Sequence, residues 1–275
     1  MDGLDLLSVK IADIRKVNEK IRLVKLGLQQ GPLNVSFVIA GQWLDTYVPG
    51  IAKPGGFTIA SAPSVAAQFA EPYFELAVQA APENPVAAWL WQPESEILGK
   101  VLEVRVGGSF VCPPSEGLAS IQRIVLVAGG VGINPLVSIL GYIADENKRL
   151  NIQIVVLYST KVPQDGDLGK VLFLNRIVDI FRLGQITGEV KLFLTGLLSH
   201  SRELTGETRD EVNLKFGRMA WHDLLSEIHA GHSKDSTLVY VCGPPTMTNY
   251  FVDLLTTPAM AGVINAGLVK SEKWW

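Results

Sequence analysis

The sequence predicts two domains, an N-terminal antiparallel β-barrel followed by a C-terminal α/β domain with a doubly wound parallel sheet. The chain has 275 residues, 48% of them hydrophobic, and one hydrophobic core seldom grows beyond this length. Short alternating runs fill the first part, whereas strand-like and helix-like runs alternate in the rest. A Pro-Pro-Ser-Glu-Gly linker at 113–117 separates them. We expect the barrel over residues 1–115 and the α/β domain over residues 120–275.

The first part contains short β-like runs between turn residues. Residues 21–26 and 74–78 alternate apolar and polar side chains, which is typical of strands with one buried face. Asn84 and Pro85 predict the cap and the first position of a short helix over residues 85–91. Regularly spaced short strands with one helix indicate a small antiparallel barrel. The expected strands lie within residues 9–14, 21–26, 37–50, 55–63, 74–78 and 101–106.

The second part alternates strands with helices, and this rhythm predicts a parallel sheet with helices on both faces. Residues 199–217 are polar and are expected to form a long loop, and residues 267–270 to add an edge strand. The predicted strands are 123–128, 152–158, 190–195 and 237–242, followed respectively by helices 134–145, 168–182, 219–230 and 245–256.

A strand, a glycine turn and a helix start follow one another within residues 124–144. The apolar run 124–127 is typical of a buried strand, and it breaks at Ala-Gly-Gly-Val-Gly over residues 128–132. Asn134 is expected to cap the helix and Pro135 to occupy its first position. Glycines let a ligand approach the backbone, and the N–H groups and dipole at a helix start attract phosphate. This is the pattern of a dinucleotide-binding turn.

Two other interpretations of residues 124–144 stay open. A charge-free run of about 20 residues is long enough to cross a membrane. Three glycines and an Asn-Pro pair in its middle argue against a membrane helix. A glycine turn that binds no ligand is the second alternative.

Composition excludes several other classes. The net charge is −3 and there is no basic block, so nucleic acid is not an expected partner. Cys112 and Cys242 are too few for an iron–sulfur cluster and fit a reduced compartment. His222, His229 and His232 are expected on a surface helix face, and we expect no metal site. We find no targeting segment and no membrane span, and we expect a soluble intracellular protein, cytoplasmic or mitochondrial.

The domain order and the glycine signatures resemble the ferredoxin–NADP reductase superfamily. Within it, the eukaryotic oxidoreductase NAD-binding domain-containing branch is most similar. Three segments carry this resemblance: Gly-Gly-Phe-Thr-Ile-Ala-Ser at 55–61, Ala-Gly-Gly-Val-Gly-Ile-Asn-Pro-Leu at 128–136 and Glu-Lys-Trp-Trp at 272–275. The resemblance implies FAD on the barrel, NAD or NADP on the α/β domain, and hydride transfer between them.

The resemblance implies a flavin site on the first domain. Phe57 would stack on the flavin and Thr58 would donate a hydrogen bond near its reactive nitrogen. Ile59 and Ala60 complete the segment. The alternative for Phe57 and Thr58 is an ordinary place in the barrel core and at a strand edge.

The phosphate end of this flavin site departs from the superfamily pattern. Gly55 stands where the superfamily has an arginine for the flavin phosphate. The pyrophosphate turn Gly-x-x-Ser/Thr corresponds to residues 84–87, which lack both the glycine and the hydroxyl. The candidate replacements are the helix N–H groups that follow Pro85 and the ammonium of Lys53.

The resemblance also implies a nicotinamide site on the second domain. Cys242, in a Cys-Gly-Pro-Pro-Thr-Met run, would lie beside nicotinamide C4, and buried inert filler is its alternative. Lys161 falls near the superfamily's 2′-phosphate arginine, and an acidic ribose ligand is missing there, so NAD and NADP both stay open. The expected cofactor-binding residues are Gly129, Gly130, Val131, Gly132, Ile133, Asn134, Pro135, Ser159, Lys161, Cys242, Gly243, Pro244 and Met247.

Trp275 at the end of the chain is expected to cover the flavin and to yield to nicotinamide, with packing onto the barrel as its alternative. Thr58, Cys242 and Trp275 are thus the expected catalytic residues. The function expected is a flavin-dependent NAD(P)H oxidoreductase that passes electrons to an external acceptor, a protein or a small molecule. The alternatives are an NAD(P)-binding module or sensor with weakened or lost flavin binding, and an enzyme that uses FMN.

Overall fold

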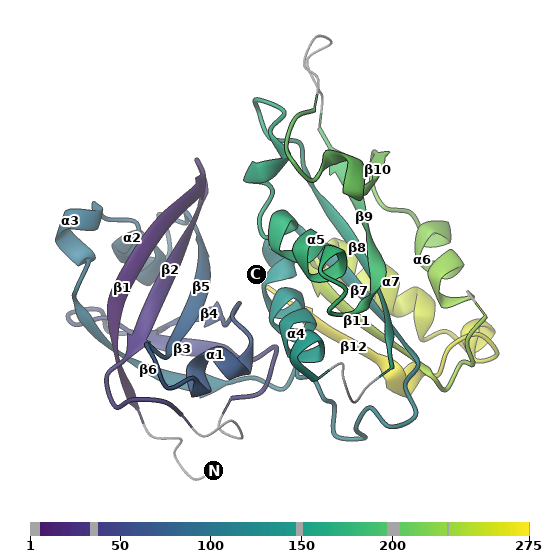
Figure 1. The fold of residues 1–275 in the computed structure, drawn as a ribbon, viewed down its shortest axis with the longest axis horizontal. Coiled ribbons are helices and arrows are strands. Elements are labelled where there is room, and N and C mark those ends of the chain that lie inside the picture. Colours follow the sequence, from purple (N-terminus) through teal and green to yellow (C-terminus); the bar gives the residue numbers. More distant parts are fainter. Residues whose placement is uncertain (1–5, 34–37, 147–150, 197–203, 230, 275) are drawn as a thin grey trace. The chain divides into compact units, whose positions relative to one another are not determined.

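A computed structural model describes residues 6–33, 38–146, 151–196, 204–229 and 231–274 (Figure 1). The chain divides after Pro113 into two compact units, and residues Val137–Tyr142 group with the first. Each unit contains one six-stranded sheet. The domain bounds at residues 115 and 120 stay a prediction.

The sheet of the first unit is antiparallel throughout, in the order β4-β3-β6-β1-β2-β5. In β6 the apolar Leu102, Val104 and Val106 are buried, whereas Glu103 and Arg105 are exposed, so its alternation gives one core face. The strands are β1 (Leu7–Asn18), β2 (Ile21–Leu28), β3 (Trp43–Tyr47), β4 (Gly55–Thr58), β5 (Tyr73–Gln79) and β6 (Val101–Gly107), and the helices are α1 (Pro63–Ala67), α2 (Pro85–Leu90) and α3 (Glu94–Ile97).

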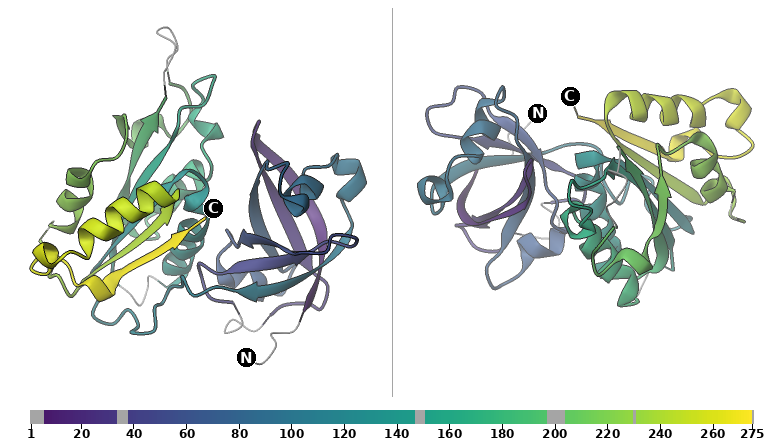
Figure 2. Two further views of the ribbon diagram at one scale, coloured as in Figure 1. Left: turned by 180° about the vertical axis from the view of Figure 1, so that it is seen from behind. Right: turned by 90° about the horizontal axis from the view of Figure 1, so that it is seen from above.

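The two edges of this sheet meet and close it into a barrel (Figure 2). Ile59, directly after β4, forms an antiparallel bridge with Leu76 of β5. The N–H of Ala60 donates to the carbonyl oxygen of Glu75 at 2.8 Å. Closure leaves neither edge open to another chain. The prediction of an N-terminal antiparallel barrel is confirmed.

The sheet of the second unit is parallel throughout, in the order β10-β9-β8-β7-β11-β12. Its central strands β7 and β11 are buried along their whole length, which is why they read as continuous apolar runs. The strands are β7 (Arg123–Gly129), β8 (Gln153–Lys161), β9 (Thr187–Thr195), β10 (Asn213–Phe216), β11 (Thr237–Gly243) and β12 (Val269–Lys273), and the helices are α4 (Ile133–Glu146), α5 (Leu174–Arg182), α6 (Trp221–Ile228) and α7 (Pro245–Leu255).

Helices cover both faces of the parallel sheet, so the doubly wound prediction is confirmed (Figure 2). Helices α6 and α7 share one core with the sheet, since Leu224 and Phe251 belong to the same buried cluster as Val125 and Val241. Short 3₁₀ turns lie at Gly130–Gly132, Leu168–Lys170, Arg209–Glu211, Pro258–Met260 and Ala266–Leu268.

Three local predictions need correction. The polar segment 199–217 is not all loop, because Asn213–Phe216 forms the edge strand β10 beside β9, while residues 199–203 lie outside the described residues. The helix predicted over 168–182 begins at Leu174, after a separate 3₁₀ turn. His232 lies beyond the end of α6, where its Nε2 contacts Gln153 Oε1 at 3.3 Å, whereas His222 and His229 are exposed on or beside that helix.

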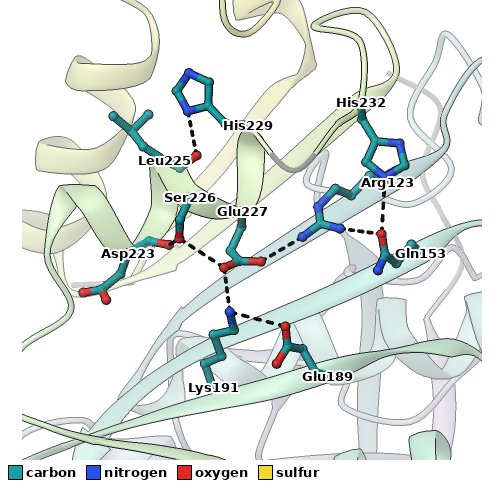
Figure 3. Close-up of polar contacts among 10 residues, drawn as sticks. All are labelled: Arg123, Gln153, Glu189, Lys191, Asp223, Leu225, Ser226, Glu227, His229 and His232. Carbon is teal, nitrogen blue, oxygen red and sulfur yellow. Dashed lines mark hydrogen bonds and ion pairs between the residues drawn. The ribbon is translucent and has the colours of Figure 1, made fainter.

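A buried ion network ties α6 to the sheet (Figure 3). Glu227 of α6 accepts from Arg123 of β7 at 2.8 Å and from Lys191 of β9 at 2.7 Å. Arg123 also donates to Gln153 at the start of β8. In the part of the chain that the structure describes, no helix is long and apolar enough to cross a bilayer.

Candidate nucleotide-binding site

The order of the parallel strands reverses between β7 and β11. From β7 the chain passes through α4 to β8 on one side, while β11 lies on the other side of β7. Such a switch point opens a crevice at the carboxyl ends of the two strands, where ligands of doubly wound sheets bind. The glycine turn 129–132 follows β7, and Cys242 and Gly243 end β11. Two motifs that are more than a hundred residues apart in the sequence therefore meet.

The glycine turn leads directly into helix α4. Gly130–Gly132 forms a 3₁₀ turn, and Gly130 has a φ of +55°, which glycine adopts without strain. The predicted cap is wrong by position, because α4 begins at Ile133 and makes Asn134 its second residue and Pro135 its third. The third position still suits proline, because N–H groups of the first helical turn have no intrahelical acceptor.

The turn and the end of β11 interlock so closely that side chains are excluded. A Cβ atom on Gly132 would lie 2.3 Å from the carbonyl oxygen of Cys242. A Cβ atom on Gly129 would lie 2.8 Å from both Met247 Sδ and Pro244 Cδ. Around Gly130, in contrast, a Cβ atom would meet nothing within 4 Å. Packing within the protein therefore requires glycine at positions 129 and 132, whereas the space around Gly130 is open to a ligand.

The end of β8 completes this edge of the sheet. Ser159 pairs with Gly129 in the parallel register and is half-buried. Lys161 lies two residues further, opposite Thr195 of β9, and is exposed. Ser159 thus lies beside the glycine turn, whereas Lys161 lies beyond the residues of β8 that pair with β7. Its predicted contact with a 2′-phosphate stays a prediction.

Cys242 faces a partner that the sequence reasoning missed. It pairs in register with Glu272 of β12, so the thiol and a carboxyl group lie on adjacent strands, next to the switch point. Burial raises the pKa of Cys242, and the charge of Glu272 raises it further, so the thiol stays protonated. Burial also raises the pKa of Glu272 to about 7, partly offset by a hydrogen bond from Trp274. The only sequence signal was an acidic residue two positions before Trp274.

The aromatic end of the chain is held through this carboxyl group. The indole Nε1 of Trp274 donates to Oε2 of Glu272 at 3.0 Å, and Trp274 is half-buried. Trp275, predicted to cover the flavin, lies outside the described residues.

The predicted flavin segment lies on β4 and directly after it. Thr58 is 6% exposed and pairs with Trp43 of β3, while Phe57 is half-buried. Ile59 and Ala60 are buried and form the bridge that closes the barrel. The four residues are thus contiguous, and their roles toward a flavin stay predictions.

The structure tests whether this barrel fits the phosphate end of FAD. Gly55 is buried, and a Cβ atom there would lie 2.7 Å from Phe57 Cε2 and 2.8 Å from Val86 Cβ. No side chain, least of all an arginine, has room at that position. Asn84 caps α2 as predicted, and its Oδ1 accepts from the N–H groups of Val86 and Ala87 at 3.1 Å each. These donors are engaged, so the predicted phosphate site after Pro85 does not fit.

The nicotinamide nucleotide does fit the second unit. The glycine turn leaves open space at Gly130, beside the start of a helix 14 residues long. A barrel followed by a doubly wound sheet with this turn is the two-domain fold of the ferredoxin–NADP reductase type. Comparison with known proteins agrees, because residues 121–254 match the family described as the ferric reductase NAD-binding domain.

Similar proteins cover nearly the whole chain. Oxidoreductase NAD-binding domain-containing protein 1 of Pongo abelii is 32% identical over 259 residues, covering 86% of this chain and 70% of that protein. The Danio rerio protein of the same name is 30% identical over 278 residues, covering 99% and 93% respectively. The chain belongs to the family of oxidoreductase NAD-binding domain-containing protein 1.

A solved structure shows the same fold. The flavohem-like FAD/NAD-binding domain of nitric oxide dioxygenase from Vibrio cholerae superimposes with a TM-score of 0.67 at 16% identity. The match covers 98% of this chain and 99% of that one.

Proposed function

We propose that the protein is an NAD(P)H-dependent flavin oxidoreductase that passes a hydride from nicotinamide to a flavin and electrons on to an external acceptor. The observation that carries this proposal is the interlock of the glycine turn with Cys242 and Gly243 at the switch point. It supports binding of a nicotinamide nucleotide beside a buried thiol and a carboxyl group. The name of the Vibrio cholerae domain, which includes FAD, supports a flavin as the second redox partner.

The glycine turn binds and orients the nucleotide in this proposal. The space above Gly130 admits a phosphate to the backbone, and the positive end of α4 stabilises its charge. Gly243 lets Met247 pack directly against the backbone at the end of β11, because a Cβ atom there would lie 2.6 Å from Met247 Cε. The nicotinamide ring then has a flat backbone surface beside Cys242. Orientation of this kind is the main contribution that a protein makes to hydride transfer.

Cys242 and Glu272 set the polarity beside the ring. The thiol of Cys242 is buried and protonated, so it presents a neutral, polarisable surface rather than a nucleophile. Burial raises the pKa of Glu272 to about 7, so its carboxyl group can hold a proton near neutral pH. It can therefore release or accept the proton that accompanies two-electron chemistry at this edge.

A bound flavin supplies the ability to accept two electrons at once and to return them singly or in pairs. The acceptor after the flavin is external in this proposal. The chain has two cysteines, both buried and neither in a disulfide, and an iron–sulfur cluster needs about four ligands.

The test is an absorption spectrum of the purified full chain, alone and after incubation with FAD or FMN, and then with NADH or NADPH under anaerobic conditions. The proposal expects a flavin band that one of the two nucleotides bleaches. A flavin band that neither nucleotide bleaches would contradict it. So would a protein that induces no change in the spectrum of added flavin.

A second function, an NAD(P)-binding module without flavin, is favoured by one observation. Gly55 packs against Val86 at the place where the superfamily holds the flavin phosphate. Colourless protein that binds NADH but leaves the spectra of FAD, FMN and riboflavin unchanged would support the module over the reductase.

A further inference from the structure

We propose that the barrel binds the ring system of a flavin but not its phosphate, so that flavin is an exchangeable substrate and not a resident cofactor. This inference rests on the proposed function. It follows from the misfit at the phosphate end, and it names free flavin as the class of molecule that carries electrons away. Each turnover would convert one NAD(P)H and one oxidised flavin into one NAD(P)⁺ and one reduced flavin anion, which leaves.

The first observation is that the place of the phosphate-binding arginine is filled by packing. The ring of Phe57 and the side chain of Val86 approach Gly55 so closely that a Cβ atom would overlap both, at 2.7 Å and 2.8 Å. Val86 is 1% exposed, so it belongs to the barrel core. Restoring a cation at residue 55 would require α2 to move away from β4.

The second observation concerns the backbone donors beside that place. The N–H groups of Val86 and Ala87 both donate to Oδ1 of Asn84. In this chain the side chain of Asn84 therefore occupies the donors that an anion would need. A phosphate could bind them only by displacing a neutral cap that is already in place, with no net gain in hydrogen bonds.

The third observation is that two arginines of the barrel are committed elsewhere. Arg22 donates to the carbonyl oxygens of Leu90 and Trp91 at 2.9 Å, and its guanidinium lies 4.3 Å from the Trp91 ring centroid. Arg105 bonds the carboxylate of Asp45. Lys53, exposed and two residues before Gly55, is the cation to test as a replacement.

The contribution of the phosphate to flavin affinity can be measured with natural flavins. Riboflavin, FMN and FAD share the isoalloxazine ring, and riboflavin has no phosphate. Charge-assisted hydrogen bonds to a phosphate would raise the affinity for FMN over riboflavin by roughly 10- to 100-fold. A barrel without them should bind riboflavin and FMN within about threefold of each other, a difference of less than one hydrogen bond.

The experiment titrates the full chain, dialysed free of flavin, with riboflavin, FMN and FAD, and follows quenching of flavin fluorescence. Gel filtration after loading then tests retention. We expect similar dissociation constants for riboflavin and FMN and loss of all three flavins on the column. Lys53→Ala should leave the FMN-to-riboflavin ratio unchanged. Thr58→Val removes the hydroxyl that this proposal assigns to the flavin ring, and it should weaken binding of riboflavin and of FMN equally.

Three outcomes would overturn the inference. FMN binding that is more than about tenfold tighter than riboflavin binding would show that the protein binds the phosphate, and it would not contradict the proposed function. A loss of that preference in Lys53→Ala would identify the lysine as the phosphate-binding residue. Binding of none of the three flavins would overturn this inference and the proposed function together.

Discussion

Arg123 and Glu227 form a buried ion pair between positions 104 residues apart in the sequence, with 2.8 Å between Nη2 and Oε2 (Figure 3). Arg123 is the first residue of β7, and Glu227 belongs to α6. The same carboxylate accepts from Lys191 at 2.7 Å, so two cations share one anion. The side chains of Arg123 and Glu227 are only 3% and 7% exposed, respectively.

Loss of the shared anion should destabilise the fold. We expect Glu227→Gln to lower the free energy of unfolding by about 3–5 kcal/mol, because it removes the counter-charge of the buried Arg123 and leaves Lys191 with the exposed Glu189 alone. Glu189→Gln is the matched control, since Glu189 pairs with the same lysine at 3.3 Å but is 49% exposed. The control should cost about 1 kcal/mol or less. Urea unfolding of both variants measures the difference, and equal costs would contradict the dominant role of the buried pair.

The interlock at the switch point predicts a second effect. Gly132→Ala should abolish tight NAD(H) binding and lower the free energy of unfolding by about 1–3 kcal/mol, because the new Cβ overlaps the backbone of Cys242. Gly262→Ala is the control, since a Cβ atom there meets nothing within 4 Å. Isothermal titration with NADH checks the first effect and urea unfolding the second. Unchanged nucleotide affinity in Gly132→Ala would refute the geometric argument.

The protonation of Cys242 can be tested by alkylation. In Cys112→Ala, which leaves Cys242 as the single thiol, iodoacetamide at pH 8 should label the folded chain at least about 100-fold more slowly than the chain in urea. Burial of the sulfur and its raised pKa both slow the reaction. Mass spectrometry over time gives the two rates. Similar rates would mean an accessible thiolate, in conflict with the burial of this site.

Glu272 predicts how stability depends on pH. Burial raises its pKa to about 7 from an ordinary value near 4.5, so between these pH values the folded chain holds a proton that the unfolded chain has released. The native state therefore loses stability as the pH rises through this window, by about 1–3 kcal/mol after allowance for its partial exposure. Glu272→Gln should remove this loss.

The measurement for Glu272 is urea unfolding of the wild type and of Glu272→Gln at pH 5 and at pH 8. We expect the free energy of unfolding of the variant, relative to that of the wild type, to increase by about 1–3 kcal/mol from pH 5 to pH 8. Parallel behaviour of the two proteins would contradict a raised pKa at this position.

Local patterns predicted the elements with strong periodicity. The alternation in β6 indicates a strand with one buried face, as in an antiparallel barrel. The continuous apolar run of β7 indicates a strand buried on both faces, as in a covered parallel sheet. Asn84 was predicted correctly as a cap because capping depends on residues two and three positions away. The start of α4 was misplaced because the 3₁₀ turn of Gly130–Gly132 runs directly into it.

Tertiary relationships were beyond the sequence pattern. Strand β10 has four residues at a sheet edge, half of them exposed at its two ends, so it has no marked periodicity. The pairing of Cys242 with Glu272 depends on the register of β11 and β12, which are separated by α7. The packing of Gly55 against Val86 likewise joins two segments that only the folded barrel brings together. The departures from the superfamily pattern were visible in the sequence, but their physical reason was not.

Strand β7 carries the ion pair at its first residue, Arg123, and the nucleotide turn at its last, Gly129. The two ends are separated by roughly 20 Å of rigid extended backbone. An engineer who wants a more heat-resistant variant can therefore redesign the Arg123 end, for example with apolar replacements for the ion network. Such changes lie a full strand length away from the glycine turn.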